Sequence, residues 1–331
     1  MIVLSCQDKN WEAFDSHIKN KGDLIYFVNK DLGYVAGSND EMINPEDEFP
    51  KFISHSYIAI TKDGGKTWKD ISPNFRGKIN KLQAFENGGI VAVLEDDVIR
   101  NSTFIVSENY GRTWRQLFKQ YISNIYFKNI KEGELLFLDK EKKTHYVKFE
   151  NNKFGNEVVF NTRLWGKIKD NYYLLNSKYN YQKQNDFCEN IQLINLKKQE
   201  RFISFEKNIV YTAFAETEKY LYLLVENENL ESRILKFDGK KFFDISLGKY
   251  QNYSAFDFYA FNKTLVLNAY KNNSGSILGV TKCLLYSTDE GKNWQLKDMP
   301  DNLLATPQFM YKDQFFITGT FGGFQKYNFK N

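Results

Sequence analysis

The stretch that decides the fold reads Thr-Lys-Asp-Gly-Gly-Lys-Thr-Trp and occupies residues 61–68. Two further stretches share its pattern, Ser-Glu-Asn-Tyr-Gly-Arg-Thr-Trp at residues 107–114 and Ser-Thr-Asp-Glu-Gly-Lys-Asn-Trp at residues 287–294. The third position is always Asp or Asn, which can accept backbone N–H groups of a turn. The fifth position is always Gly, which adopts positive φ without a Cβ clash. The pattern therefore predicts a tight hairpin turn that ends on a large aromatic side chain.

This motif is the Asp-box, or bacterial neuraminidase repeat, and the chain resembles the propellers of sialidases, sortilin-type receptors and photosystem-assembly-factor-like proteins. The resemblance implies a β-propeller and no particular activity. We expect the box residues to be structural, with each tryptophan wedged between neighbouring sheets, where a large aromatic buries much area. These residues are Asp63, Gly65, Trp68, Asn109, Gly111, Trp114, Asp289, Gly291 and Trp294.

Spacing extends the repeat beyond the three complete boxes. The first two boxes begin 46 residues apart, and the third begins 180 residues after the second, which is four steps of 45. A period of this length is typical of propellers and solenoids. Degenerate polar turns fill the gap at residues 149–154, 197–202 and 237–242, each ending on an aromatic. With one more anchor near the N-terminus, the aromatic anchors are Trp11, Trp68, Trp114, Phe154, Phe202, Phe242 and Trp294.

These anchors predict an all-β fold: a seven-bladed β-propeller of four-stranded antiparallel blades that occupies residues 1–331 as one domain. Neighbouring anchors are 40 to 57 residues apart, and the path through both termini adds 48 residues, so the circle closes at seven. Residues 323–328 are expected to pair beside an outer strand that begins at Trp11. Pairing of the N- and C-terminal strands would remove an open sheet edge. Residues 2–6 are an alternative for that place.

Composition agrees with an all-β chain and excludes several classes of function. Aromatic residues make up 17% of the sequence, and short apolar runs are broken by Asn, Lys, Asp and Gly. The net charge is +4, with basic residues scattered among acidic ones, so we expect no nucleic-acid binding. No segment approaches the roughly 18 continuous apolar residues of a transmembrane helix. We expect a monomer without cofactor or metal.

The three cysteines are an odd number at wide spacing, which argues against a disulfide framework and a thiolate metal site. Cys6 stands apart, because residues 2–8 resemble the end of a bacterial lipoprotein signal, in which the cysteine carries the lipid anchor. A complete signal needs about 7–15 apolar residues, more than this stretch holds. Two interpretations stay open: residues 1–6 are a lipoprotein signal remnant, or Cys6 is an ordinary thiol. The first favours the bacterial cell envelope, as lipoprotein or periplasmic protein, over the cytoplasm.

A binding site is expected on the face opposite the boxes. The box turn joins the third and fourth strands of a blade, so the loops between the second and third strands lie on the other face, with the connections between blades. The longest insertions are in those loops, at residues 40–50, 95–101, 177–183 and 271–276. Binding sites on rigid scaffolds usually lie on such loops. The candidates are Phe75, Arg76, Arg100, Arg163, Trp165, Tyr179 and Tyr181, and the alternative for each is an ordinary solvated or packed position.

Motifs for catalysis are missing from the sequence. In Phe75-Arg76-Gly77-Lys78 the arginine follows the first box and lacks the Ile and Pro of the sialidase Arg-Ile-Pro motif. His17, His55 and His145 are too scattered for a zinc site, and the acidic residues 46–48 are a weak candidate for calcium beside a solvated loop. No nucleophile elbow, phosphate loop or dinucleotide fingerprint occurs. We therefore expect a non-catalytic propeller that binds a protein or glycan. The alternatives are a sialidase-like exo-glycosidase and an assembly or immunity factor that binds one partner protein.

Overall fold

The computed structural model describes residues 11–14, 22–46, 51–96, 101–139, 143–160, 164–168, 171–179, 188–195, 198–205, 209–227, 229, 231–272, 280–299, 308–311, 314–318 and 324–329. These residues form antiparallel strands and one 3-10 turn, Gly248–Tyr250. Contacts divide the chain into two compact units, Met1–Asn161 with Asn302–Asn331, and Thr162–Asp301. Each unit is built from four-stranded meanders, called blades below.

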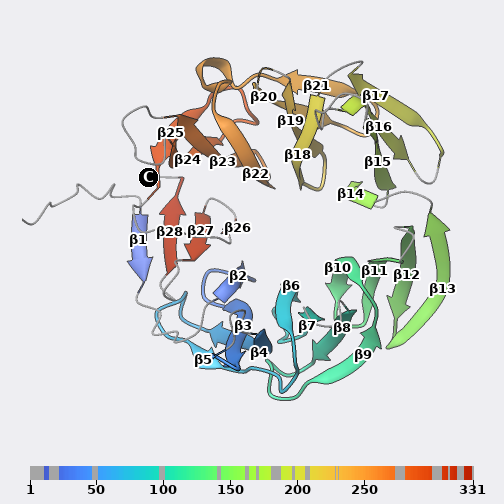
Figure 1. Ribbon diagram of the computed structural model, residues 1–331, viewed down its shortest axis with the longest axis vertical. Helices are drawn as coiled ribbons and strands as arrows, with labels where there is room; N and C mark the ends of the chain where they lie inside the picture. The colour runs from blue at the N-terminus through green and yellow to red at the C-terminus, as the bar shows by residue number, and fades with distance from the viewer. Residues whose placement is uncertain are drawn as a thin grey trace, which may run out of the picture. The chain divides into compact units, whose positions relative to one another are not determined.

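The first unit holds four blades (Figure 1). Three of them are continuous in sequence. One consists of β2 (Gly22–Phe27), β3 (Gly33–Ile43), β4 (Lys51–Thr61) and β5 (Lys69–Asp70). The next consists of β6 (Lys78–Ala84), β7 (Ile90–Asp96), β8 (Asn101–Ser107) and β9 (Arg115–Lys119). The third consists of β10 (Ile122–Asn129), β11 (Glu132–Leu138), β12 (Thr144–Glu150) and β13 (Lys153–Phe160).

The fourth blade of this unit joins the two ends of the chain. It consists of β26 (Gln308–Tyr311), β27 (Gln314–Thr318), β28 (Phe324–Asn328) and, as its outer strand, β1 (Trp11–Phe14). β1 pairs antiparallel with β28, with Trp11 opposite Tyr327 and Phe14 opposite Phe324. The predicted closure through the terminal strands is confirmed.

The second unit holds one four-stranded sheet and one eight-stranded sheet. The eight strands are β14 (Leu164–Ile168), β15 (Asn171–Tyr179), β16 (Cys188–Asn195), β17 (Arg201–Phe205), β18 (Ile209–Glu216), β19 (Leu221–Asn227), β20 (Ser232–Phe237) and β21 (Phe242–Ile245). A single residue pair, Cys188 with Ile209, joins β16 to β18, so this sheet is two meanders linked at one point. The last blade is β22 (Ser254–Phe261), β23 (Thr264–Asn272), β24 (Val280–Ser287) and β25 (Gln295–Asp298).

Burial explains why these segments are strands. The second strands carry continuous apolar runs, such as residues 90–94 in β7 and 221–225 in β19, and these are buried on both faces. A strand covered on both faces selects such runs over an alternating pattern. The fourth strands are exposed instead, as in β5 and β21. Position within the blade therefore sets the composition of each strand.

Neighbouring blades within a unit share apolar cores. In the first unit, Tyr34 and Ile58 of one blade pack with Ile79 and Ile105 of the next. In the second unit, Tyr222 and Ile234 lie in one core with Leu267 and Leu285. In such cores, burial of a side chain of this size contributes about 1.5–3 kcal/mol.

Candidate functional site

The first Asp-box closes the turn from β4 to β5 with side-chain hydrogen bonds to its own backbone. The Thr61 hydroxyl donates to Asp63 Oδ1 (2.8 Å) and accepts the Gly65 N–H (2.9 Å). Asp63 also accepts the N–H (2.9 Å) and the hydroxyl (2.6 Å) of Thr67. The bonds from Thr67 are the main reason why the pKa of Asp63 is lowered to about 2. The carboxylate is the centre of the turn.

The second and third boxes repeat this arrangement between β8 and β9 and between β24 and β25. In each box the first-position hydroxyl accepts the N–H of the fifth-position glycine, at 2.9 Å and 2.8 Å respectively. Asn109 accepts the Thr113 N–H at 2.9 Å, and Asp289 accepts the Asn293 N–H at 2.9 Å. Asparagine and aspartate therefore serve the same turn with different charge.

The fourth residue of each complete box ties the box turn to another turn of the same blade. This residue has positive φ, namely 73° at Gly64, 58° at Tyr110 and 62° at Glu290. Its N–H donates to a carbonyl in the turn between the first two strands of the blade. The acceptors are the carbonyls of Asp31 (2.9 Å), Gly88 (2.8 Å) and Lys263 (2.8 Å). The sequence pattern places no restriction on this position, so the side chains did not reveal the contact.

The boxes also hold neighbouring blades together. A Cβ atom on Gly111 would lie 2.5 Å from Ile71 Cδ1, and one on Gly291 would lie 2.5 Å from Ile245 Cγ2, both in the preceding blade. Only glycine fits so close an approach. The Trp114 indole N–H donates across the same boundary to the Ile71 carbonyl (3.0 Å).

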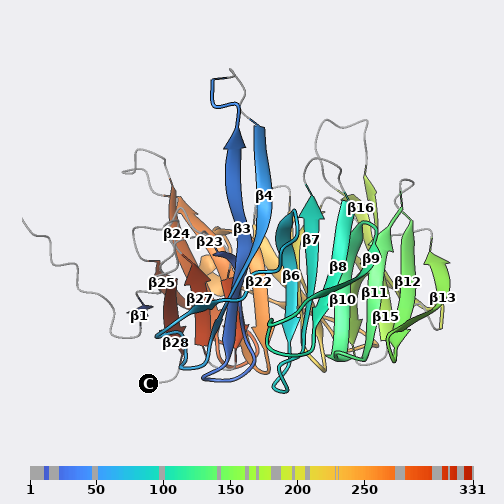
Figure 2. The same ribbon diagram turned by 90° about the horizontal axis from the view of Figure 1, so that it is seen from below.

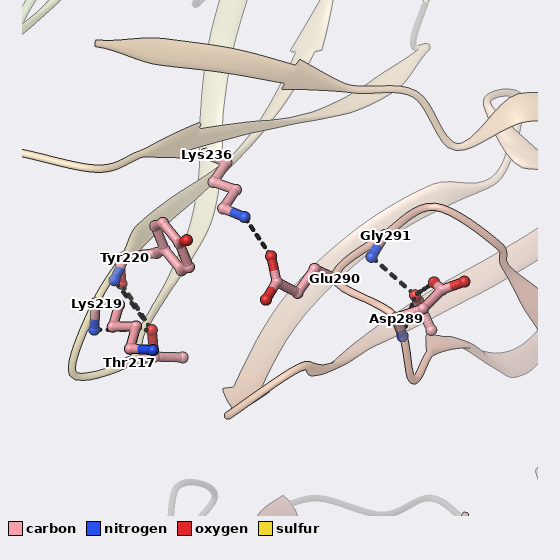
Figure 3. Close-up of polar contacts among 8 residues, drawn as sticks. Thr217, Lys219, Tyr220, Lys236, Asp289, Glu290 and Gly291 are labelled. Carbon is pink, nitrogen blue, oxygen red and sulfur yellow. Dashed lines mark hydrogen bonds and ion pairs between the residues drawn. The ribbon is translucent and has the colours of Figure 1, made fainter. Parts of the chain in front are cut away.

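A buried ion pair adds to this link in the second unit (Figure 3). Lys236 Nζ on β20 lies 2.6 Å from Glu290 Oε2 in the third box, and their side chains are 13% and 28% exposed. The same ammonium group lies 3.7 Å from the centre of the Tyr220 ring. In the first unit, Lys62 of the first box lies over the ring of Tyr110 in the second box. The box end of the blades is therefore engaged in internal contacts.

The opposite end of the first unit carries a projecting hairpin. β3 and β4 pair without a break from Gly33–Thr61 to Ile43–Lys51, and Figure 2 shows them continuing beyond the ends of β6 and β7. Met42 lies directly opposite Phe52, and the two are 48% and 52% exposed. Residues 40–43 were expected in a loop, and they form strand instead.

A connection between blades supports the base of this hairpin. The Ser56 N–H donates to the Phe75 carbonyl (3.1 Å), and the Gly77 N–H donates to the Ser54 carbonyl (2.8 Å). His55 and Arg76 form a single antiparallel bridge. Phe75 is half-buried against the core shared by the first two complete blades.

Charged pairs hold the same region. Arg76 Nε lies 3.2 Å from Asp96 Oδ2 at the end of β7. On the hairpin, the Ser54 hydroxyl donates to Asp40 Oδ1 (2.7 Å), and His55 Nε2 lies 3.4 Å from Glu41 Oε2. The hairpin therefore rises from a polar, internally bonded base.

Six first strands carry a one-residue β-bulge against the second strand of their blade. Each bulge lies in the half of the strand that is farther from the box turn. A bulge redirects one side chain and is typical of strand ends next to functional sites. The extra residues are Asp23, Asn80, Ser123, Trp165, Thr212 and Phe256. No motif in the sequence marks these bulges.

The predicted site residues fall into three groups. Phe75 and Arg76 lie together at the base of the hairpin. Trp165 is the bulge residue of β14 and Tyr179 is the last residue of β15, while their side chains are outside the description. Arg100, Arg163 and Tyr181 lie outside the described residues, as do Cys6 and residues 47 and 48 of the acidic segment.

Met42 and Phe52 were not predicted as site residues. The signal that could have found them is the alternation of apolar and polar residues on both sides of the 44–50 insertion, which is typical of strands rather than of a loop.

Other candidate centres are occupied by internal contacts. The two ring nitrogens of His145 contact different carboxylates, Glu157 and Asp139, so the ring lies between them. Within the described ranges, no group of His, Cys, Asp and Glu could hold a metal ion. Cys283 is buried, and burial raises the pKa of its thiol to about 12. In the described part of the chain, no helix has the length and apolar character of a membrane-spanning segment.

A shallow groove of about 420 Å³ lies over β12 and β13. Its lining includes Tyr146, Phe154 and Val158 with exposed lysine and glutamate side chains. It lies away from the hairpin and contains none of the predicted site residues.

Comparison with known proteins agrees with this architecture. The model of the BNR/Asp-box repeat family matches residues 285–296. The structure of YCF48 bound to D1 peptide is 15% identical, has a TM-score of 0.59 and aligns over 98% of each chain. The β-propeller domain of the Trilobed protease from Pyrococcus furiosus is 9% identical, has a TM-score of 0.63 and aligns over 93% of this chain and 92% of that one. This chain is a BNR-type β-propeller.

The propeller differs from the Pyrococcus domain at its closure. That domain has an open velcro topology, whereas here β1 pairs with β28 within one blade. The neighbours thus include a propeller with a bound peptide and a propeller domain of a protease, and identities this low show the fold alone.

A curated relative, an ATP-dependent helicase/nuclease polypeptide of Lactococcus lactis subsp. cremoris (strain SK11), is 23% identical over 321 residues. The match covers 91% of the propeller and 24% of that protein, so the chain spans about a quarter of its length. The propeller sequence contains no phosphate-loop motif, which a nucleotide-driven helicase would need.

Proposed function

We propose that this propeller is a non-catalytic binding protein that recognises a protein partner at the end opposite the Asp-boxes, with the β3–β4 hairpin as the main contact. The observation that carries the proposal is the exposed pair of Met42 and Phe52 on a hairpin that projects beyond its neighbours. Large apolar side chains exposed together mark interaction surfaces more often than isolated ones do.

The rigidity of the box end supports the same proposal. Three boxes fix the far ends of their blades by side-chain and backbone bonds, and the box in the first blade terminates β4 itself. A projection on a rigid scaffold loses little conformational entropy when a partner binds it.

YCF48 bound to D1 peptide shares the fold over 98% of both chains, and this supports a peptide or protein partner over a glycan. The hairpin points the same way, because two adjacent large apolar side chains suit a protein contact. We therefore place protein recognition ahead of glycan recognition.

A glycosidase is the weaker candidate. The carboxylates at this end have polar neighbours that fit a structural role: Asp40 with Ser54, Glu41 with His55, and Asp96 with Arg76. A panel of fluorogenic glycosides, including a sialoside, is expected to show no turnover above the rate with heat-denatured protein. Turnover that is lost in a purified Arg76→Ala variant would contradict the non-catalytic assignment.

Site-specific photocrosslinking tests the proposal. Benzoylphenylalanine replaces Phe52 in one variant and Lys66, an exposed residue of the first box, in a matched variant. Illumination in cells of the source organism is expected to give one discrete protein adduct at position 52 and none at position 66. Adducts at position 66 alone, or a glycan array that responds while position 52 crosslinks to no protein, would contradict it.

A further inference from the structure

We propose that the hairpin binds a basic segment of its partner, in which an apolar side chain lies between lysine or arginine residues. This inference rests on the proposed function and adds the chemistry of the partner. The docking surface consists of residues 40–46 and 51–54, called the outer hairpin below.

The apolar part of the outer hairpin is a cross-strand pair. Met42 and Phe52 are directly opposite each other in the register, so their side chains leave the ribbon on the same side. The pair Asp40–Ser54 precedes them on that side. Directly opposed side chains on one face of a ribbon have Cβ atoms about 4.5–5.5 Å apart, close enough to act as one contact.

The second side of the ribbon has the same composition. Glu41 is opposite Ile53, and Ile43 is opposite Lys51, so an isoleucine lies next to an acidic residue here as well. Ile43 and Ile53 are half-buried, whereas Met42 and Phe52 are about half exposed. The first side therefore offers the larger apolar contact.

The charge of the outer hairpin is opposite to that of the whole chain. Asp40, Glu41 and Glu46 are exposed acidic residues, and Lys51 is the basic residue among the described positions of this surface. Between Asp40 and His55 the sequence has five acidic residues and one lysine, in a chain whose net charge is +4. Local acidity on a basic protein attracts cationic partners over roughly 8–10 Å at physiological ionic strength.

The internal contacts leave this acidity largely uncompensated. The Glu41 side chain is 71% exposed, and its imidazole neighbour His55 lies at 3.4 Å. The nearby cation Arg76 is instead paired with Asp96, whose side chain is 15% exposed. Arg76 therefore neutralises a carboxylate of the hairpin base rather than the acidic residues of the outer hairpin.

Geometry and charge together select the occupant. An apolar pair flanked by carboxylates on both strands is complementary to a segment with a central leucine or phenylalanine and lysines or arginines around it. An acidic segment of the same hydrophobicity would place like charges against Asp40 and Glu46, which disfavours it.

Fluorescence anisotropy with synthetic peptides tests this inference on the full chain. The probe is the labelled peptide Gly-Lys-Lys-Leu-Lys-Phe-Lys-Lys-Gly. One control peptide replaces every lysine by glutamate, and a second replaces leucine and phenylalanine by serine. We expect binding of the probe alone, with a Kd that rises as salt is added.

Protein variants locate the contact. Asp40→Asn/Glu41→Gln/Glu46→Gln and Met42→Ser/Phe52→Ser should each raise the Kd about tenfold or more, which corresponds to about 1.4 kcal/mol. The matched control Glu150→Gln/Glu200→Gln/Glu218→Gln removes three exposed acidic residues elsewhere and should change the Kd less than twofold. Circular dichroism confirms that each variant is folded.

The inference is overturned if the hairpin variants bind the probe as tightly as the native chain, or if the glutamate peptide binds as well. Its failure differs from failure of the proposed function. A crosslinked partner whose adduct maps to a neutral or acidic segment would retain the function and refute the basic occupant. Absence of any protein adduct at position 52 would refute the function itself.

Discussion

The two ends of β4 differ in almost every physical property, although they belong to one strand. The first five residues, Lys51–His55, are exposed or half-buried, and the last six, Ser56–Thr61, are buried. At the buried end, Thr61 begins an Asp-box whose side chains bond to the backbone and whose fourth residue binds a second turn. At the exposed end, Phe52 faces solvent beside Met42.

The difference separates stability from recognition. Buried hydrogen bonds and close packing resist substitution, because each lost partner leaves a polar group unsatisfied or a cavity unfilled. Exposed residues on a projecting ribbon can change with little effect on the fold. One blade can therefore keep its box while its hairpin adapts to a partner.

The strongest expected effect comes from adding one carbon at a box glycine. Gly111→Ala places a Cβ 2.5 Å from Ile71 Cδ1 at a φ of 77°, so both the backbone and the neighbouring blade are strained. We expect the free energy of unfolding to fall by about 2–4 kcal/mol. Urea denaturation measures it. The matched control Gly155→Ala has its nearest neighbour at 3.6 Å and should stay within about 1 kcal/mol of the native chain. Equal effects at both positions would refute the packing role of the box glycine.

Removal of the box carboxylate is expected to have the next largest effect. Asp63→Ala deletes the acceptor of three bonds, from Thr61 and from the N–H and hydroxyl of Thr67. The expected loss of unfolding free energy is about 2 kcal/mol, from chemical denaturation. Lys66→Ala, an exposed change in the same turn, serves as control and should cost less than about 0.5 kcal/mol. If both variants unfold at the same midpoint, the carboxylate does not hold the turn.

Acid should weaken the box end by a smaller amount. The pKa of Asp63 is about 2 in the folded chain against an ordinary 3.8, so the fold favours the charged form. The resulting stability is present above pH 3.8 and is lost as the pH falls toward 2. Asp63→Asn removes this contribution, so its stability should depend less on pH between 4 and 2 in thermal melts. An unchanged slope would show that Asp63 is not a source of the acid sensitivity.

The smallest effect on stability is expected at the exposed end of the strand. Met42→Ser/Phe52→Ser removes two side chains that are about half exposed. The free energy of unfolding should change by less than about 0.5–1 kcal/mol, measured by the same urea titration. A loss as large as that of Asp63→Ala would mean that the pair is part of the core, which contradicts its role as a binding surface.

Much of the fold could be predicted because the Asp-box encodes it in side chains. The aromatic anchors marked the outer strands: Phe202 lies in β17, Phe242 begins β21, and Trp11 begins β1. The strands predicted after Phe202, at 209–215, 220–226 and 233–237, match β18, β19 and β20 within one residue at each end.

Features carried by the backbone could not be predicted. The N–H of the fourth box residue binds another turn whether its side chain is Gly64, Tyr110 or Glu290, so no residue type reports it. The bulges at the first strands are likewise silent, since Asn80, Ser123 and Phe256 share no chemistry. Both features depend on register, which the sequence pattern leaves open.

The candidate site was predicted as a face and missed in its details. Loops between second and third strands were expected to carry the site, and Phe75 and Arg76 do lie at the hairpin base. Residues 40–43 looked like loop because Asp40 and Glu41 have low strand propensity. Pairing with residues 51–54 overrides that propensity and aligns Met42 with Phe52. The contact that matters most in our proposal arises from that long-range pairing.

Hydrogen exchange along β3 and β4 tests the central claim most directly. Amide exchange of the full chain is compared with and without the partner protein identified by crosslinking at position 52. Our account predicts slower exchange upon binding in residues 38–46 and 51–55, and unchanged exchange in the box at residues 61–68. Protection of the box residues, with the hairpin unchanged, would contradict the separation of recognition from stability.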